Sequence, residues 1–146
     1  MIRPLNFPIA AEQLIPHRPP MQLIDRLIAC DGLQGVAEST LLIDSIFLDD
    51  DGSIERAAMI EMMAQAFAAV KGFAAQAEKT KIRERGYLVG VKRFTFQGKA
   101  YSGDRLLISI SKTGETEEYA LAEGRVERGE EVLASGNLMV WIPAEV

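Results

Sequence analysis

Two side chains far apart in the sequence, His17 and Glu61, are of the types that exchange protons near neutral pH. An imidazole needs little tuning to act as a base at pH 7, and a carboxyl surrounded by apolar residues can act as an acid. His17 lies in a loop stiffened by three prolines, and Gln65 follows Glu61 by one turn on the same helix face. The alternatives are that His17 only packs or hydrogen-bonds, and that Glu61 points into water or pairs with a lysine.

The helix that carries Glu61 is predicted over residues 54–72, IERAAMIEMMAQAFAAVKG, and its pattern continues through FAAQAEK. It is apolar around almost its whole circumference, which is typical of a buried or membrane-spanning helix. Its uninterrupted apolar runs are far shorter than the ~18 residues that cross a bilayer. We therefore expect a helix covered by protein on most sides, entered through Asp51, Gly52 and Ser53.

Most of the remaining chain has the patterns of strands. Residues 21–30 and 35–43 predict a hairpin around Asp31-Gly32, and further strands are predicted over residues 86–98, 106–111, 119–127 and 131–142, with a turn at 113–117. A break in alternation between Val91 and Phe94 predicts a bulge. Strands joined by short turns pair antiparallel, so we expect an α+β fold with a curved sheet of about six strands around one long helix.

Length and composition limit the possible functions. The 146 residues predict one domain over residues 1–146, and the formal net charge of -5 argues against nucleic acid as a partner. The single cysteine, Cys30, excludes an internal disulfide framework and fits a reducing, cytoplasmic compartment, where we expect a buried structural thiol. The N-terminal residues show neither a signal peptide nor a membrane anchor.

Several kinds of site do not fit the residues present. One histidine and one cysteine are too few for a zinc site, and no G-x-S-x-G elbow, P-loop or G-x-G-x-x-G motif occurs. We therefore expect no metal. The sheet can cover the predicted helix on one side only, so we expect a second copy to cover its remaining apolar faces, giving a homodimer or higher oligomer.

Three segments together resemble a known family. LIPHRPPMQLIDRL is similar to the PHR segment near the start of the FabZ-type beta-hydroxyacyl-acyl-carrier-protein dehydratases, and IEMMAQ resembles the motif of their central helix. VKRFTFQGKAYSGDRLLISI resembles a later stretch in which a strand leads through a Gly-Asp turn into the next strand. The matches come in the family's order and span residues 14–110. The resemblance implies a hotdog fold, in which a sheet wraps one long helix and two copies pair.

The resemblance also implies roles for residues. Glu61 falls on the family's catalytic carboxylate, but the Gly-His-Phe-Pro-Gly segment that carries the usual histidine is absent before the helix. In this respect the chain is similar to the divergent ApeP-type dehydratases, associated with aryl polyene and related lipid clusters, and the working base would then be His17. The reaction implied is loss of water from a 3-hydroxyacyl thioester, with no cofactor beyond the phosphopantetheine that carries the substrate.

The implied substrate-binding residues lie on the helix and on one strand. Gln65 would orient the carboxylate, and backbone N–H donors for the thioester carbonyl would come from Arg56 and Ala57 or from Val89 and Gly90. The expected partners are an acyl carrier protein or acyl-CoA, with the basic run at residues 79–85 as a docking surface and a second dehydratase as an alternative subunit. A hotdog thioesterase and a non-catalytic partner subunit remain as alternative functions.

Overall fold

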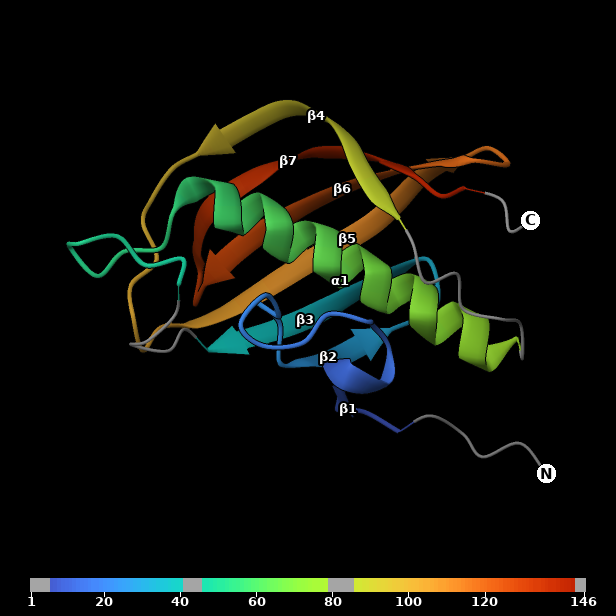
Figure 1. Cartoon of the computed structure of the whole chain (residues 1–146), viewed down its shortest axis with the longest axis horizontal. Helices are drawn as coiled ribbons and strands as arrows, with labels where there is room; N and C mark the ends of the chain where they lie inside the picture. Colours follow the sequence, from blue (N-terminus) through green and yellow to red (C-terminus); the bar gives the residue numbers. More distant parts are fainter. Residues whose placement is uncertain (1–5, 41–45, 79–85, 144–146) are drawn as a thin grey trace.

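The computed structural model describes residues 6–40, 46–78 and 86–143. In Figure 1 a long helix, α1 (Arg56–Ala77), lies across one face of an antiparallel sheet. The strands run in the spatial order β1-β2-β3-β5-β6-β7-β4, which leaves β4 at one edge. Their bounds are β1 (Ile9–Ala10), β2 (Arg26–Cys30), β3 (Gln34–Thr40), β4 (Tyr87–Phe96), β5 (Arg105–Glu115), β6 (Tyr119–Arg128) and β7 (Glu131–Trp141), and a 3-10 turn, η1 (Ala11–Gln13), follows β1.

The α+β architecture predicted from the sequence is confirmed, with differences in detail. The sheet has seven strands in the described part of the chain, one more than expected. The additional strand is β1, whose two residues are too few to show an alternating pattern in the sequence. The predicted first strand is wrong over residues 21–25, which form the end of a loop. The turn predicted at 113–117 is present but begins later, after β5 ends at Glu115. The last residues of the predicted strand 35–43 lie outside the described residues.

The bulge predicted in β4 is confirmed. The pairing of β4 with β7 shifts register between Lys92 and Thr95, and Arg93 within this interval has a positive φ of 54°. A second shift lies between Leu88 and Gly90. As a result Leu88 and Val91 pair with the buried residues Val140 and Leu138, so both face the helix side of the sheet.

The helix α1 buries most of its circumference but leaves one flank partly open. Its apolar residues that are buried against the sheet are Ala58, Met59, Met62, Met63, Ala66, Phe67, Ala69 and Val70. The open flank carries Ile60, Glu61, Ala64 and Ala68, which follow one another at helical spacing and are only half-buried. The sheet therefore covers one side of the helix, as expected, and the described chain leaves an apolar flank uncovered.

The entrance to α1 is fixed by the loop between β4 and β5. The helix has Glu55 at its N-cap without a side-chain cap, and Asp51 instead accepts a 2.9 Å hydrogen bond from the Ser53 N–H. The Asp51-Gly52-Ser53 segment thus ends before the helix and does not cap it, contrary to expectation. The Ile54 N–H donates to the Ala100 carbonyl at 2.8 Å, which ties the chain just before α1 to the β4–β5 loop.

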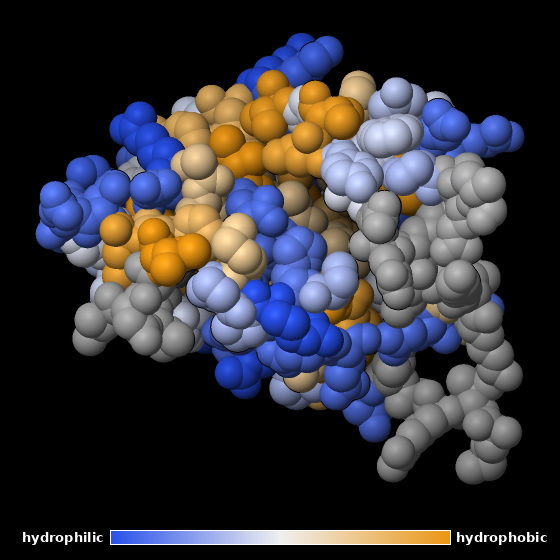
Figure 2. All heavy atoms as spheres, viewed as in Figure 1, coloured by the Kyte–Doolittle hydropathy of each residue, from blue (hydrophilic) through white to orange (hydrophobic). Residues whose placement is uncertain are grey.

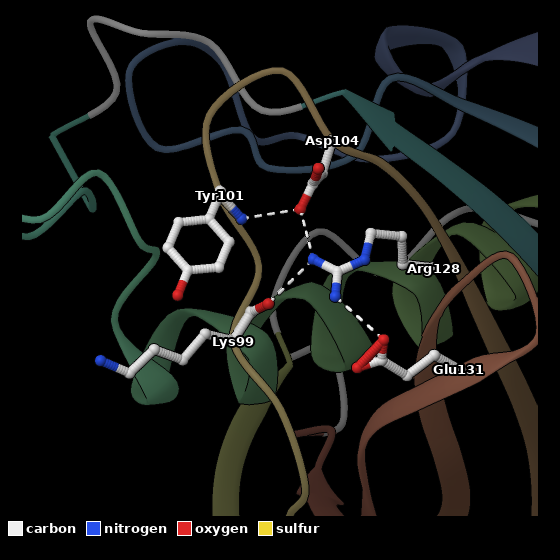
Figure 3. Close-up of polar contacts among 5 residues, drawn as sticks. All are labelled: Lys99, Tyr101, Asp104, Arg128 and Glu131. Carbon is white, nitrogen blue, oxygen red and sulfur yellow. Dashed lines mark hydrogen bonds and ion pairs between the residues drawn. The ribbon is translucent and has the colours of Figure 1, made fainter.

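Arg128 holds this β4–β5 loop in place (Figure 3). Its guanidinium donates to Asp104 Oδ2 at 2.7 Å, to the Lys99 carbonyl at 3.0 Å and to Glu131 at 3.0 Å. Burial alone would raise the pKa of Asp104, but the Tyr101 N–H and Arg128 together bring that pKa below its ordinary value. The ionised Asp104 carboxylate therefore stabilises the folded protein above pH about 4, and this contribution is lost as the pH falls through the folded-state pKa of Asp104.

Gly72 allows the backbone before His17 to approach α1 closely. A Cβ built on Gly72 would lie 2.3 Å from the Leu14 carbonyl oxygen, and Leu14 itself is buried. The close neighbour is backbone, so it cannot swing aside as a side chain could. Gly72 is thus a point of contact between α1 and the loop that carries His17.

We predict that Gly72→Ala destabilises the protein by about 1–3 kcal/mol because of this overlap, although helix propensity alone predicts a gain of about 1 kcal/mol. Urea unfolding measures the difference. Ala77→Gly, at the exposed end of α1, is the control for propensity and should cost no more than about 1 kcal/mol. A Gly72→Ala variant as stable as the wild type would contradict the proposed contact.

Candidate active site

The fold brings His17 and Glu61 together within one chain. His17 Nε2 lies 3.7 Å from Glu61 Oε1, and their side chains are 32% and 36% exposed. His17 Nδ1 is buried without a hydrogen-bond partner in the described part of the chain, so the ring presents Nε2 to the carboxyl. The separation is slightly too long for a hydrogen bond, and it places an imidazole and a carboxyl around one small space.

Glu61 is less enclosed than its neighbours in the sequence suggested. We expected a carboxyl among Met, Ile, Ala and Phe side chains, but Glu61 lies on the open flank of α1 and is 36% exposed. Of the alternatives left open by the sequence, the structure supports a partly exposed Glu61, because the apolar residues beside it in sequence turn toward the sheet. Glu61 instead faces a groove that solvent can enter.

Gln65 connects Glu61 to the loop that carries His17. Its side chain is buried, with 1% of its surface exposed. Its Oε1 accepts a 2.8 Å hydrogen bond from the Leu23 N–H, and its Nε2 donates to the Met21 carbonyl at 2.8 Å and to Glu61 Oε1 at 3.1 Å. A residue so buried lies behind the carboxyl and not on the groove surface, which fits a positioning role better than direct substrate contact.

Arg18 fixes the backbone on both sides of His17. Its guanidinium donates to the carbonyls of His17 at 2.7 Å, Ile15 at 2.9 Å and Glu12 at 3.2 Å. The sequence analysis did not single out Arg18, although its place directly after His17 in the PHR segment was the available signal. In Figure 1 this loop lies beside the middle of α1. Arg18 binds carbonyls in the first part of the loop, and Gln65 binds Met21 and Leu23 in its later part.

A groove of about 1290 Å³ extends from the His17–Glu61 pair along α1. Its walls come from the loop before β2, the open flank of α1, the start of β4 and the turn between β5 and β6. Apolar lining residues include Leu14, Ala64, Phe67, Ala68, Leu88, Val140 and Ile142. The groove thus has an apolar stretch along the helix and polar or charged side chains at both ends, and an apolar stretch of this kind can hold an apolar part of a ligand.

The other predicted binding residues lie at the borders of this site or away from it. Ala57 is exposed one turn before Glu61 on α1, and the Arg56 guanidinium lies 5.4 Å from the centroid of the Phe96 ring. The groove is lined by Tyr87 and Leu88 of β4 but not by Val89 or Gly90, so the structure does not bring those two to His17 within one chain. The predicted docking run at residues 79–85 lies outside the described residues.

Other chemistry has little support in the described residues. They contain no group of three or more His, Cys, Asp or Glu side chains placed to hold a metal ion. Cys30 is half-buried, its Sγ accepts a hydrogen bond from the Gly32 N–H, and burial raises the pKa of the thiol, which disfavours a nucleophilic thiolate. No helix among residues 6–40, 46–78 and 86–143 combines the length and apolar character needed to span a bilayer.

One long helix wrapped by an antiparallel sheet of this strand order defines the class of hotdog-fold proteins. The E. coli PaaI protein from the phenylacetic acid degradation operon shares the fold, with 12% identity, a TM-score of 0.63, and coverage of 79% of this chain and 80% of that chain. Within this class the chain belongs to the ApeP-like family, whose model, described as ApeP dehydratase, matches residues 9–146.

Two further relatives are similar over most of their length. The 3-hydroxyacyl-[acyl-carrier-protein] dehydratase FabZ of Syntrophomonas wolfei is 27% identical over 128 residues, which cover 87% of this chain and 89% of that protein. One chain in the structure of the dehydratase heterocomplex ApeI:P from Xenorhabdus doucetiae superposes on this chain with a TM-score of 0.87. The two chains are 26% identical, and the match covers 94% of this chain and 93% of that chain. The family resemblance inferred from the sequence is thereby confirmed.

We predict that Gln65→Leu lowers the free energy of unfolding by about 2–3 kcal/mol, because it leaves the buried Leu23 N–H and Met21 carbonyl without their partners. Hydrogen exchange at the Leu23 amide should accelerate together with the loss of stability. Gln76→Leu, which removes a hydrogen bond to the Gln13 carbonyl at a more exposed place, is the matched control. Unchanged exchange at Leu23 in Gln65→Leu would show that the loop is held in another way.

Proposed function

We propose that this protein dehydrates 3-hydroxyacyl thioesters carried on an acyl carrier protein, giving the 2-enoyl thioester. The observation that carries the proposal is the 3.7 Å separation of His17 Nε2 and Glu61 Oε1 in a groove that has an apolar stretch along α1. An imidazole base and a carboxyl acid are the two groups that removal of water across C2 and C3 requires. Membership in the ApeP-like family and similarity to a FabZ dehydratase support the same reaction.

His17 and Glu61 divide the proton transfers between them. His17 Nε2 takes the C2 proton, which the thioester carbonyl acidifies, and the electrons of the C2–H bond form the C2=C3 double bond. The C3–O bond breaks as Glu61 protonates the departing hydroxyl, which leaves as water. The step ends with the proton gained by His17 and lost by Glu61, and their short separation lets it return directly or through one water.

The thioester carbonyl needs hydrogen-bond donors as charge develops on it. The first-turn amides of α1, at Arg56 and Ala57, have no partners within the helix, and the Glu61 side chain leans back toward that turn. Val89 and Gly90 lie on the edge strand, so they would serve the site of a second subunit. The phosphopantetheine of the carrier holds the substrate, and the proton transfers themselves call on neither a metal nor a redox group.

The wider setting of the reaction follows from the same proposal. We infer one domain over residues 1–146 acting in the cytoplasm, in the synthesis of a fatty acid or an aryl polyene-type lipid. An acyl-CoA is the alternative substrate carrier. Residues 79–85, with a basic composition, stay our prediction for the surface that meets an acidic carrier protein.

We predict that His17→Ala and Glu61→Gln each lower kcat for a 3-hydroxyacyl carrier substrate by roughly 10²–10⁴-fold, because each removes one proton transfer. The assay follows the enoyl thioester by absorbance and free thiol by a colour reagent. Glu123→Gln, an exposed carboxylate on the sheet face away from α1, is the matched control and should retain activity.

The products distinguish the alternatives in the same assay. Free thiol without enoyl product would contradict dehydration and favour a thioesterase. Neither product, combined with tight binding of a second dehydratase, would favour a non-catalytic partner subunit. Enoyl product that persists in both variants would rule out the roles given to His17 and Glu61.

We also propose that β4 pairs with a second subunit. It is an edge strand of the sheet, and it exposes Tyr87, Leu88, Val89 and Val91, each by more than a third of its surface. Figure 2 shows apolar side chains gathered over this part of the molecule, above the open flank of α1. An exposed apolar edge strand invites pairing with another chain, and a second copy would cover the strand and the flank together.

We predict that Val89→Lys combined with Val91→Lys shifts the protein from dimer to monomer, measured by light scattering after size-exclusion chromatography. Two lysines on the edge oppose strand pairing by charge repulsion. Lys substitution of the exposed Leu33, at the β2–β3 turn, is the control and should leave the oligomer intact. If the wild type is a monomer that assembles only with a second dehydratase, the proposed homodimer is wrong and the assembly is a heterodimer.

A further inference from the structure

The loop that carries His17 is attached to the sheet as well as to α1. Ser39 of β3 donates its hydroxyl hydrogen to the Leu23 carbonyl at 2.5 Å. Ser39 and Leu23 are both buried, with 1% and 7% of their surfaces exposed. A hydroxyl that water does not reach needs a partner within the protein, and here the end of the loop supplies it.

Leu23 is therefore held by side chains from two different elements. Its N–H donates to Gln65 Oε1 of α1 at 2.8 Å, and its carbonyl accepts the hydrogen bond from Ser39 of β3. Leu23 precedes β2, which begins at Arg26. The two side-chain hydrogen bonds thus fix the peptide groups of Leu23 between the helix and the sheet, where no strand pairing does so.

The same series of hydrogen bonds continues to the proposed acid. Gln65 Nε2 donates to Glu61 Oε1 at 3.1 Å, while Gln65 Oε1 accepts from the Leu23 N–H. The oxygen and the nitrogen of an amide lie in one rigid plane. A displacement of Leu23 that rotates the Gln65 amide therefore also moves the hydrogen-bond donor of Glu61.

The residues of β3 on either side of Ser39 also bind the end of the loop. The Asp25 N–H donates to the Glu38 carbonyl at 2.8 Å, and Asp25 Oδ2 accepts a 2.8 Å hydrogen bond from the Thr40 N–H. These contacts set the position of the loop along β3. Ser39 does not line the groove, so it can act on the site only through Leu23.

We propose that Ser39 is a positioning residue for the acid–base pair. Its hydroxyl fixes Leu23, and Leu23 in turn fixes the Gln65 amide beside Glu61 and the loop that presents His17. This inference rests on the dehydration proposed above. Because proton transfer depends steeply on the distance between donor and acceptor, a small displacement of the loop lowers kcat. Substrate binding changes little, since Ser39 lies outside the groove.

The first test is Ser39→Ala, which removes the hydroxyl donor of the Leu23 carbonyl. We expect kcat for a 3-hydroxyacyl carrier substrate to fall by about tenfold to a hundredfold, with KM little changed. Ser53→Ala is the matched control, because Ser53 is similarly buried and its hydroxyl bonds Asp51, outside the loop. Ser39→Cys, of similar size but a weaker donor, covers the case of an alanine variant that does not fold and should have an intermediate kcat. A wild-type kcat in both Ser39 variants overturns the inference.

A double-mutant cycle separates positioning from a general loss of folded protein. His17→Ala removes the group that the loop positions, so adding Ser39→Ala to it should lower kcat much less than in the wild type. A purely structural effect of Ser39→Ala would lower kcat by the same factor with and without His17. Equal factors in the two backgrounds therefore overturn the inference.

The position of the loop can also be measured without turnover, which separates this inference from the proposed reaction. His17 is the only histidine, so the absorbance of its adduct with diethyl pyrocarbonate reports on this ring alone. The rate of adduct formation and hydrogen exchange at the Leu23 amide should both rise in Ser39→Ala and not in Ser53→Ala. Both rates rising in a protein that dehydrates no substrate would support the attachment of the loop by Ser39 and contradict the dehydratase. Dehydration with kcat and both rates unchanged in Ser39→Ala would leave the proposed function in place and remove the role of Ser39.

Discussion

The candidate site depends on one buried amide. Gln65 lies within the protein, yet its side chain makes three hydrogen bonds that join α1 to the loop before β2 and to Glu61. Without Gln65 the buried Leu23 N–H and the partly buried Met21 carbonyl would lose their partners, and the loop would be held less firmly against the helix. The position of His17 relative to Glu61 therefore follows from a residue that itself does not face the groove.

Two further contacts restrict the loop that carries His17, in addition to the hydrogen bonds of Gln65. Gly72 lets the Leu14 carbonyl approach the helix axis, and Arg18 binds the carbonyls next to His17. These contacts act on backbone, so they fix the path of the loop without filling the space in front of the imidazole. Pre-organisation of this kind is what general acid–base catalysis requires, since a proton transfer depends steeply on the distance between donor and acceptor.

The helix and strands of the fold could be predicted from the sequence more reliably than the geometry of the site. The apolar pattern around Glu61 is long, although polar residues interrupt it, and it predicted α1 correctly, whereas β1 has only two residues and left no pattern. The meeting of His17 with Glu61 depends on contacts between residues more than forty positions apart, such as Gln65 with Leu23, which no local pattern contains. The exposure of Glu61 could not be predicted, because periodicity describes the helix and not which flank the sheet leaves open.

The single-chain origin of the His17–Glu61 pair limits what a second subunit has to contribute. His17 and Glu61, the proposed base and acid, already lie 3.7 Å apart within one chain, so a partner is not needed to bring them together. The described chain does lack a cover for Ile60, Ala64 and Ala68 on the open flank of α1, and water reaching that flank would weaken every interaction with a developing charge. In our proposal a partner subunit closes the groove and supplies backbone N–H donors for the thioester carbonyl of the substrate. An edge strand like β4 fits both roles, in a second copy or in a different hotdog subunit.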